Sequence, residues 1–332
     1  MFRRSSLFFF FCMIIAALAL VSCSPPPVEK PPDLCWPFPP QKPRIKFVDL
    51  VIGSQDATGI REGKFSRIFF GDEGDIRFSK PAFVAYKDGA MYVTDIRSLH
   101  IFDFKRKKYI AAGTDVLITP TGVAANNEGQ VFVGDSSRKV VYIFSRHGRL
   151  LASFGRFQSP SGIAVDEARQ HLIVADAKAD DIQVFDFKGN LLFKFGKRGK
   201  EKGEFNMPYG VAVDSKGNIC VVDSGNFRVQ IFDSTGKFIS TFGHVGINPG
   251  TFARPKGIAL DSEGHIYVVD SAFGNFQIFD EQGRVYLVVG SNGYDAGQFQ
   301  LPFGIAINSS DMIFVVDQVN RRIQEFQYLK GH

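Results

Sequence analysis

Short apolar segments separated by polar turns alternate along most of the chain. In one copy of this pattern, residues 210–214 form an apolar segment, 215–218 supply turn residues, and 219–223 form a second segment that is apolar up to its terminal Asp. Two further segments follow at 229–233 and 238–243. A strand that is apolar on both faces must be buried on both faces, so the pattern predicts four packed antiparallel strands per copy.

The same four-strand unit recurs six times. Each copy opens on a proline, and an aspartate closes the second strand 14 to 16 residues later. The six pairs are Pro81 and Asp95, Pro120 and Asp135, Pro160 and Asp176, Pro208 and Asp223, Pro255 and Asp270, and Pro302 and Asp317. Units of this kind, repeated every 39 to 48 residues, are typical of propeller blades. The prediction is an all-β fold, a six-bladed β-propeller with four-stranded antiparallel blades.

The sixth copy lacks a fourth strand, because few residues remain after 324–327. A segment near the front of the chain, 47–53, carries the fourth-strand pattern found at 191–196 and 238–243. We therefore expect this N-terminal strand to complete the sixth blade and close the ring. Closure protects strand edges that would otherwise pair with other chains.

The repeats resemble those of the NHL-repeat family. The residues that carry the resemblance are Gly217-Asn-Ile219, Val221-Val-Asp223, Asn226-Phe-Arg-Val-Gln-Ile-Phe232, Ile266-Tyr-Val-Val-Asp270 and Asn320-Arg-Arg-Ile-Gln324. The resemblance covers roughly residues 45–330 and is weakest in the first copy, where Phe83 replaces the glycine of the Pro-x-Gly entry. It implies the propeller fold and leaves the function open, because propellers are scaffolds for many functions.

The N-terminal residues predict export and anchoring. Two arginines precede an apolar run at 7–21, and residues 20–23 (Leu-Val-Ser-Cys) resemble a bacterial lipobox. The resemblance implies a lipoprotein signal peptide at 1–22, lipidation of Cys23, and a place in the bacterial cell envelope. Ser24 weakly favours the outer membrane. A membrane-spanning helix and a simple cleaved signal are the alternatives.

A proline-rich segment follows at 23–44 and holds nine of the chain's 16 prolines. This density favours polyproline II, which predicts a semi-rigid spacer without packed structure. Cys35 and Trp36, the only tryptophan, lie inside this segment and are expected to be an incidental pair in the linker; docking on the propeller or on a partner is the alternative. The predicted organisation is therefore a signal peptide at 1–22, a lipidated tether at 23–44 and a propeller at 45–330.

Composition and charge narrow the function classes. The 332 residues are 45% hydrophobic and 22% charged, so disorder is excluded as the main state. Four cysteines do not make a disulfide scaffold. The net charge of +5, less the two arginines of the signal peptide, gives +3 for the mature chain. Together with export, so mild a charge argues against a nucleic-acid partner.

Residues that could carry chemistry have structural explanations. The strand-ending aspartates recur once per blade, so we expect them to accept backbone N–H bonds in turns. The six histidines do not form a recognisable set of zinc ligands, and Cys220 lies mid-strand at a predicted core position. We predict no cofactor, no metal and no enzyme activity. The alternative is a lyase or hydrolase with a metal-assisted site in the central funnel.

A surface remains as the candidate site. The residues just after each opening proline should rim the central funnel, with arginines and lysines around them. The predicted partner-binding residues are Tyr209, Arg228, Arg254, Lys256, Phe303, Arg321 and Arg322. A mixed aromatic and basic rim suits an acidic loop or peptide of an envelope protein, or an anionic glycan. The chain is thus predicted to be a monomeric, lipid-anchored propeller that acts as a protein–protein or ligand-binding platform. A generally solvated basic surface is the alternative.

Overall fold

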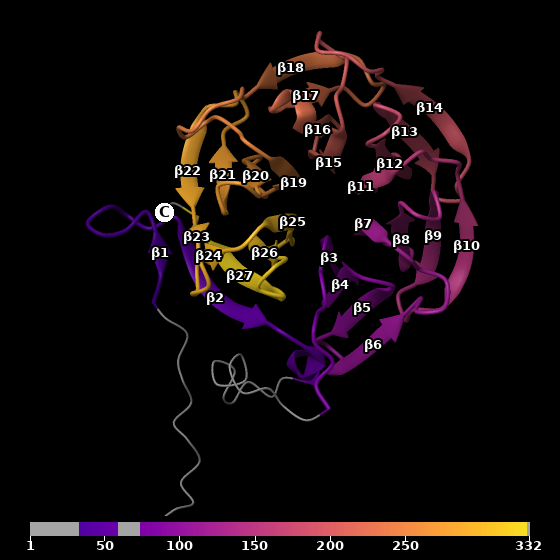
Figure 1. Ribbon diagram of the computed structural model, residues 1–332, viewed down its shortest axis with the longest axis horizontal. Helices are drawn as coiled ribbons and strands as arrows, with labels where there is room; N and C mark the ends of the chain where they lie inside the picture. Colours follow the sequence, from indigo (N-terminus) through magenta and orange to yellow (C-terminus); the bar gives the residue numbers. More distant parts are fainter. Residues whose placement is uncertain (1–32, 59–73, 331–332) are drawn as a thin grey trace, which may run out of the picture. The chain divides into compact units, whose positions relative to one another are not determined.

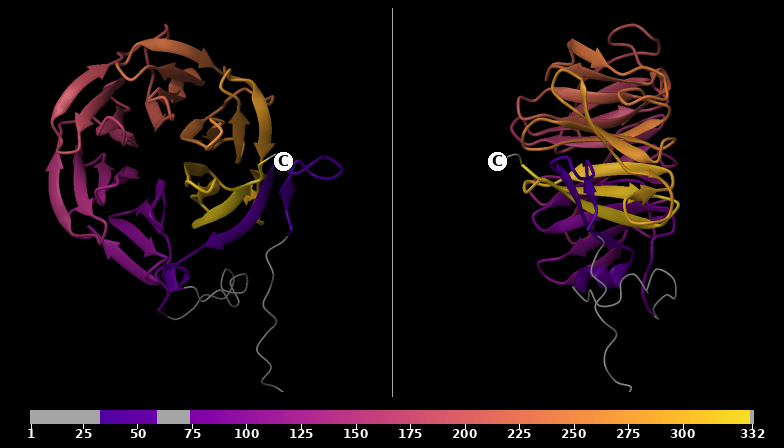
Figure 2. Two further views of the ribbon diagram at one scale, coloured as in Figure 1. Left: turned by 180° about the vertical axis from the view of Figure 1, so that it is seen from behind. Right: turned by 90° about the vertical axis from the view of Figure 1, so that its left-hand side faces the viewer.

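The computed structural model describes residues 33–58 and 74–330, which belong to one compact unit. The predicted signal peptide and Cys23 lie outside the described residues. The described part of the chain forms a ring of six antiparallel sheets around a central axis (Figures 1 and 2). The predicted all-β, six-bladed propeller is confirmed.

Blades 1 to 5 each contain four strands in sequence order from the axis outward (Figure 1). Blade 1 comprises β3 (Val84–Lys87), β4 (Ala90–Asp95), β5 (Ser98–Asp103) and β6 (Lys108–Ala112). Blade 2 comprises β7 (Pro120–Ala125), β8 (Gln130–Asp135), β9 (Val140–Ser145) and β10 (Leu150–Phe154). Blade 3 comprises β11 (Pro160–Asp166), β12 (His171–Asp176), β13 (Asp181–Asp186) and β14 (Leu191–Phe195). Blade 4 comprises β15 (Pro208–Val213), β16 (Ile219–Asp223), β17 (Arg228–Phe232) and β18 (Phe238–Phe242). Blade 5 comprises β19 (Pro255–Leu260), β20 (Ile266–Asp270), β21 (Asn275–Phe279) and β22 (Val285–Val289).

Blade 6 joins the two ends of the described chain. It contains β25 (Pro302–Ile307), β26 (Met312–Asp317), β27 (Arg322–Tyr328), β2 (Ile45–Val51) and β1 (Cys35–Trp36). β2 pairs antiparallel with β27, from Ile45 opposite Tyr328 to Val51 opposite Ile323. The expected closure by an N-terminal strand is confirmed. Four short elements of the described chain lie outside the blades: η1 (Ser54–Thr58), η2 (Ser224–Asn226), and β23 (Ser291–Asn292) with β24 (Gln298–Phe299), which pair in parallel.

The segment at 23–44 differs from the expected spacer at one point. Trp36 pairs with Ile45 in the strand β1, and its side chain is only 7% exposed. Its ring packs at 5.8 Å from the rings of Phe38 and Phe326. The prediction that Cys35 and Trp36 are an incidental linker pair is therefore wrong. The apolar indole finds a site on blade 6 that no local pattern shows.

The core consists of apolar layers between neighbouring blades. Between blades 1 and 2, for example, Tyr92 and Leu99 pack with Val131 and Phe144, all at 2% exposure or less. Successive side chains of a strand point to opposite faces, so each middle strand serves two layers. This explains why the second strand of each copy is apolar throughout. None of the helices in the described part of the chain has the length and apolar character that crossing a membrane requires.

The entry glycines let adjacent blades approach closely at the axis. A Cβ added to Gly210 would overlap the Lys256 carbonyl oxygen of the next blade, and one added to Gly257 would lie 2.6 Å from the Phe303 carbonyl oxygen. A hydroxyl or amide also links each pair of blades. Ser224 Oγ donates to the Pro255 carbonyl at 2.7 Å. The other links join Thr94 to Thr121, Thr121 to Pro160, Ser161 to Pro208, Ser271 to Pro302 and Gln318 to Pro81.

Candidate functional site

The structure brings three predicted site residues together on the axis. Tyr209, Lys256 and Phe303 follow the opening prolines of blades 4, 5 and 6. Lys256 Nζ lies 3.8 Å from the centre of the Tyr209 ring and 5.7 Å from that of Phe303. The two rings meet edge to face with centres 5.4 Å apart. These residues lie at the end of the axis where the loops between blades gather, which we call the loop face.

Phe83 of blade 1 completes this group. Its ring stacks on Tyr209 at 6.2 Å and meets Phe303 edge to face at 5.5 Å. Phe83 stands where the other copies have glycine, and blade 1 instead contacts the Thr121 carbonyl through Thr94 Oγ1 at 2.7 Å. In the sequence, the replacement of the entry glycine by Phe83 was the signal that blade 1 differs at the axis. The direction of the Phe83 side chain was not predictable from the sequence. We call Phe83, Tyr209, Lys256 and Phe303 the axial aromatic cluster.

Lys256 is the cationic residue of this cluster, and its pKa is shifted. Burial lowers the pKa of Lys256 to about 8, with the Arg254 charge acting in the same direction and Asp270 opposing it. Burial also raises the pKa of Tyr209. Within residues 33–58 and 74–330, Lys256 Nζ has ring contacts and makes no hydrogen bond or ion pair. The N–H donors of Lys256 are therefore available to an acceptor from outside the propeller. The aromatic rings of Tyr209 and Phe303 lie beside them.

Two of the predicted arginines are paired with strand-ending aspartates. Arg322 is 4% exposed, and its Nε donates to Asp317 at 2.7 Å. Arg228 is largely buried and makes the same contact with Asp223 at 2.8 Å. Arg322 is thus buried, contrary to the prediction that it rims a partner surface, whereas 14% of the Arg228 side chain is exposed and its place on that surface stays a prediction. The register of the third strand places each guanidinium beneath a loop, against the strand-ending aspartate.

The other two predicted arginines, Arg254 and Arg321, are exposed on the loop face. Arg254 precedes the opening proline of blade 5, and Arg321 lies in the turn between β26 and β27. Apolar side chains at equivalent positions share this face, although the sequence analysis did not single them out. They are Ile96, Met207, Leu301 and Val319, which are 53%, 50%, 39% and 50% exposed. The loop face therefore combines basic and apolar groups around the axial aromatic cluster.

The strand-ending aspartates cap turns as expected. Asp176 accepts backbone N–H bonds from Gln158, Ser159, Lys178 and Ala179 at 2.6 to 3.3 Å. Its counterparts also accept backbone N–H bonds at the loop face: Asp95, Asp135, Asp223, Asp270 and Asp317. Each carboxylate ties the loop before a blade to that blade's second strand.

Two histidines are held by neighbouring polar side chains. His100 is buried, with Nδ1 2.6 Å from the Tyr109 hydroxyl and Nε2 3.4 Å from Asp95. His265 Nδ1 lies 2.8 Å from Asp261, and this hydrogen bond raises the pKa of His265 despite partial burial. Across the described ranges, no group of three or more His, Cys, Asp or Glu side chains is placed to hold a metal ion.

A cavity of about 280 Å³ lies on the axis beyond the axial aromatic cluster. All six inner strands line it with mostly apolar side chains, such as Val84, Ile163 and Ile258. Lys87 of blade 1 and Glu167 of blade 3 also line this cavity, at the face opposite the loops, and form an ion pair of 2.9 Å there. The axis thus holds a cavity with a salt-bridged edge, and the axial aromatic cluster lies toward the loop face.

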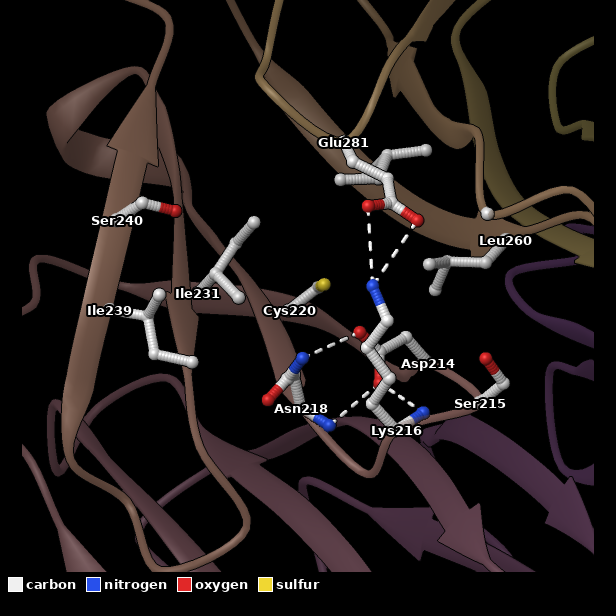
Figure 3. Close-up of a pocket in the computed structure, with 12 residues that line it drawn as sticks. Asp214, Ser215, Lys216, Asn218, Cys220, Ile231, Ile239, Ser240, Leu260 and Glu281 are labelled. Carbon is white, nitrogen blue, oxygen red and sulfur yellow. Dashed lines mark hydrogen bonds and ion pairs between the residues drawn. The ribbon is translucent and has the colours of Figure 1, made fainter.

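A smaller pocket of about 120 Å³ lies between blades 4 and 5 (Figure 3). The Lys216 Nζ atom lies 3.2 and 3.4 Å from the two carboxylate oxygens of Glu281, linking the blades. Asn218 donates to Asp214 at 2.8 Å within the predicted turn. Cys220 lies at the base, where burial raises the pKa of its thiol to about 12. The prediction that Cys220 is a core residue is confirmed.

Comparisons with known proteins identify repeats of a known family in this fold. The fold and the ring closure are those of a six-bladed β-propeller. The NHL repeat family model matches residues 205–232 and 252–279, which hold the first three strands of blades 4 and 5 and the last residues of the loops before them.

Three curated relatives share part of the sequence. Residues of this chain are 37% identical to Protein brain tumor of Drosophila melanogaster over 87 residues, which is 26% of this chain and 8% of that protein. They are 33% identical to the human E3 ubiquitin-protein ligase NHLRC1 over 123 residues, 34% of this chain and 29% of the ligase. The human NHL-repeat-containing protein 4 is 43% identical over 68 residues, 20% of this chain and 54% of that protein. The chain thus spans about half or less of each relative.

Solved structures share the fold at low sequence identity. An auxiliary nutrient binding protein from Bacteroides thetaiotaomicron is 17% identical with a TM-score of 0.62, over 76% of this chain and 70% of that one. A streptogramin B lyase is 12% identical with a TM-score of 0.59, over 76% of this chain and 94% of the lyase. Such identities show the fold alone.

Proposed function

We propose that this NHL-repeat propeller is a binding platform whose loop face captures a protein or peptide. The carrying observation is the axial aromatic cluster, where Lys256 presents unused N–H donors beside the rings of Tyr209 and Phe303, which Phe83 contacts in turn. A partner carboxylate or carbonyl would accept from Lys256, and apolar partner side chains would pack on the rings. Aromatic anchors of this kind dominate protein interfaces.

The surrounding surface supports the same role. Exposed Arg254 and Arg321 supply positive charge, and Ile96, Met207 and Leu301 supply apolar area on one face. Charge complementarity steers an acidic partner toward such a face, and the apolar side chains contribute the burial that holds it. An acidic peptide with flanking apolar residues fits this face better than a glycan, because the exposed groups are apolar as well as cationic.

A displayed peptide library selected on the purified protein tests the platform. Selected peptides should carry acidic residues beside apolar ones and bind at least about tenfold more weakly to a Tyr209→Ala, Lys256→Met variant. Lys188→Ala, Lys237→Ala is the matched control, because both lysines lie in turns at the opposite face. Equal binding to both double variants would exclude the loop face. Stoichiometric zinc or calcium in the purified protein would instead favour the metal-assisted enzyme.

We further propose that the platform is anchored in the bacterial cell envelope through a lipid on Cys23. The lipobox-like residues at 20–23 and the following proline-rich segment motivate this proposal. Labelled palmitate should enter the wild-type chain and not Cys23→Ala, and the variant should leave the membrane fraction. Lipid incorporation into both proteins, or into neither, would contradict the proposed anchor. More than one acyl chain gives stable anchoring, so the shift should be nearly complete.

A further inference from the structure

Blades 4, 5 and 6 can be compared position by position, because their repeats are 47 residues apart. Blades 4 and 6 both carry an Asn-x-Arg turn before the third strand, ending in Arg228 and Arg322. In blade 5 the same turn reads Phe273-Gly274-Asn275, so both the asparagine and the arginine of the turn are replaced. The difference falls within the sequence that the family model matches.

The arginine has a defined task in blade 4. Arg228 Nε donates to Asp223 at 2.8 Å, and one terminal nitrogen donates to the carbonyls of Glu201 and Glu204 at 2.8 and 3.0 Å. The guanidinium therefore connects the strand-ending aspartate to the loop that enters the blade. In blade 6 the equivalent partners of Arg322 are Asp317, Asp295 and Gln298, at 2.7, 2.7 and 3.0 Å.

Blade 5 lacks the guanidinium, and the Thr251 hydroxyl replaces one of its N–H donors by donating to the Asn248 carbonyl at 2.6 Å. Asp270 is fully buried, and among the described residues it accepts backbone N–H bonds and forms no ion pair. The carbonyls of Asn248 and Thr251 lie at the loop positions equivalent to Glu201 and Glu204. Asn275 is opposite Asp270 in the strand register, yet its side chain is too short to span the same gap.

A cavity of about 270 Å³ lies beside Asn275, between the entering loop and the third and fourth strands of blade 5. The Asn275 Oδ1 atom is buried and has no hydrogen-bond partner among the described residues, which is unfavourable for a polar atom removed from water. Ile247, Pro249 and Phe273 form its apolar wall. Ile247 is 87% exposed, so the cavity reaches the surface.

We propose that this cavity binds a guanidinium group supplied from outside the chain. A guanidinium presents several planar N–H donors, which suits the unpartnered Asn275 oxygen beside the buried Asp270 carboxylate, and the apolar wall suits an aliphatic stem. An ammonium group is a compact, strongly hydrated point charge that loses more hydration than a guanidinium in such a cavity. The site is separate from the axial aromatic cluster and does not depend on the proposed platform function.

Titration with N-methylguanidinium chloride, followed by calorimetry, tests the site in the full chain. Saturable binding is expected, at least about tenfold tighter than that of methylammonium at equal ionic strength. A capped Gly-Arg-Gly peptide compared with its Gly-Lys-Gly analogue distinguishes an arginine side chain from a free small guanidinium. Tighter binding of the Arg peptide than of N-methylguanidinium indicates a peptide ligand, and weaker binding indicates a small molecule. Equal affinity for N-methylguanidinium and methylammonium would overturn the proposal.

Variants at one position make the assignment specific. Asn275→Arg should supply the repeat's own guanidinium, raise the thermal midpoint and weaken N-methylguanidinium binding at least about tenfold. Asn275→Asp keeps the size of the side chain, adds a carboxylate and should bind N-methylguanidinium several-fold more tightly. This variant tests the site if Asn275→Arg does not fold. Unchanged binding in either folded variant would refute the site. Tyr209→Ala should leave probe binding unchanged, so this test and that of the platform fail independently.

Discussion

Replacing Trp36 tests whether the segment before the propeller is part of it. In the structure Trp36 pairs with Ile45, packs on Phe326 and covers Gly297 of the preceding loop. Trp36→Ala should therefore lower the free energy of unfolding, because it removes most of the apolar contact that holds β1 on blade 6. A tryptophan in a solvated spacer would make the same substitution neutral.

The magnitude follows from the burial of the ring. A buried tryptophan removes up to about 250 Å² from water, which corresponds to about 6 kcal/mol at ~25 cal/mol/Å² as an upper limit. Truncation of a core tryptophan typically costs about 3 to 5 kcal/mol. Here only two residue pairs join β1 to β2, so β1 can detach while the propeller stays folded. The loss in the free energy of unfolding therefore cannot exceed the free energy with which β1 docks on blade 6. We expect about 2 to 3 kcal/mol.

Urea unfolding followed by circular dichroism measures this loss, with Trp36→Phe as the control that retains an aromatic ring. Because Trp36 is the chain's only tryptophan, its fluorescence also reports docking directly. Native emission should be blue-shifted and shielded from acrylamide. A loss below about 0.5 kcal/mol, or emission typical of a water-exposed indole in the native protein, would refute the docked arrangement.

Three further predictions concern the axis and a buried thiol. Gly210→Ala should destabilise the protein by about 2 kcal/mol or more, because its Cβ overlaps the Lys256 carbonyl. Gly199→Ala meets only a movable side chain and is the control; equal urea midpoints would contradict this. The folded-state pKa of Lys256, lowered by burial to about 8, lies below that of the unfolded chain. The unfolded chain therefore binds more protons between about pH 8 and 10.5, so stability should rise with pH there by on the order of 1 kcal/mol, and Lys256→Met should abolish that rise. Cys220 should resist alkylation in the native protein, while Cys35 reacts; mass spectrometry of native and unfolded samples checks both, and native labelling of Cys220 would contradict its burial.

Much of the fold was predictable because its rules are local and repeat along the chain. Opening prolines, apolar second strands and strand-ending aspartates recur in every copy, so one blade explains six. The N-terminal closing strand followed from counting, since one copy lacked a strand that another segment could supply. The capping role of residues such as Asp176 followed from the same repetition.

The candidate site was predictable only in part. Tyr209, Lys256 and Phe303 were found because equivalent positions of a ring must meet at its axis. Phe83 was visible as a departure from glycine, but its ring direction depends on the space left by three other blades. For Arg322, solvent exposure could not be inferred, because a loop distant in sequence covers it.

The repeat pattern therefore predicts the number of blades, their boundaries, the ring closure and the turns, since each depends on nearby residues and a fixed repeat. Which side chains meet across blades became known only from the folded ring. Trp36 docks, Arg322 is internal and Asn275 lies beside a cavity because of distances between segments far apart in the chain. Such distances are set by packing between blades, and the repeat pattern of a single blade contains no information about that packing.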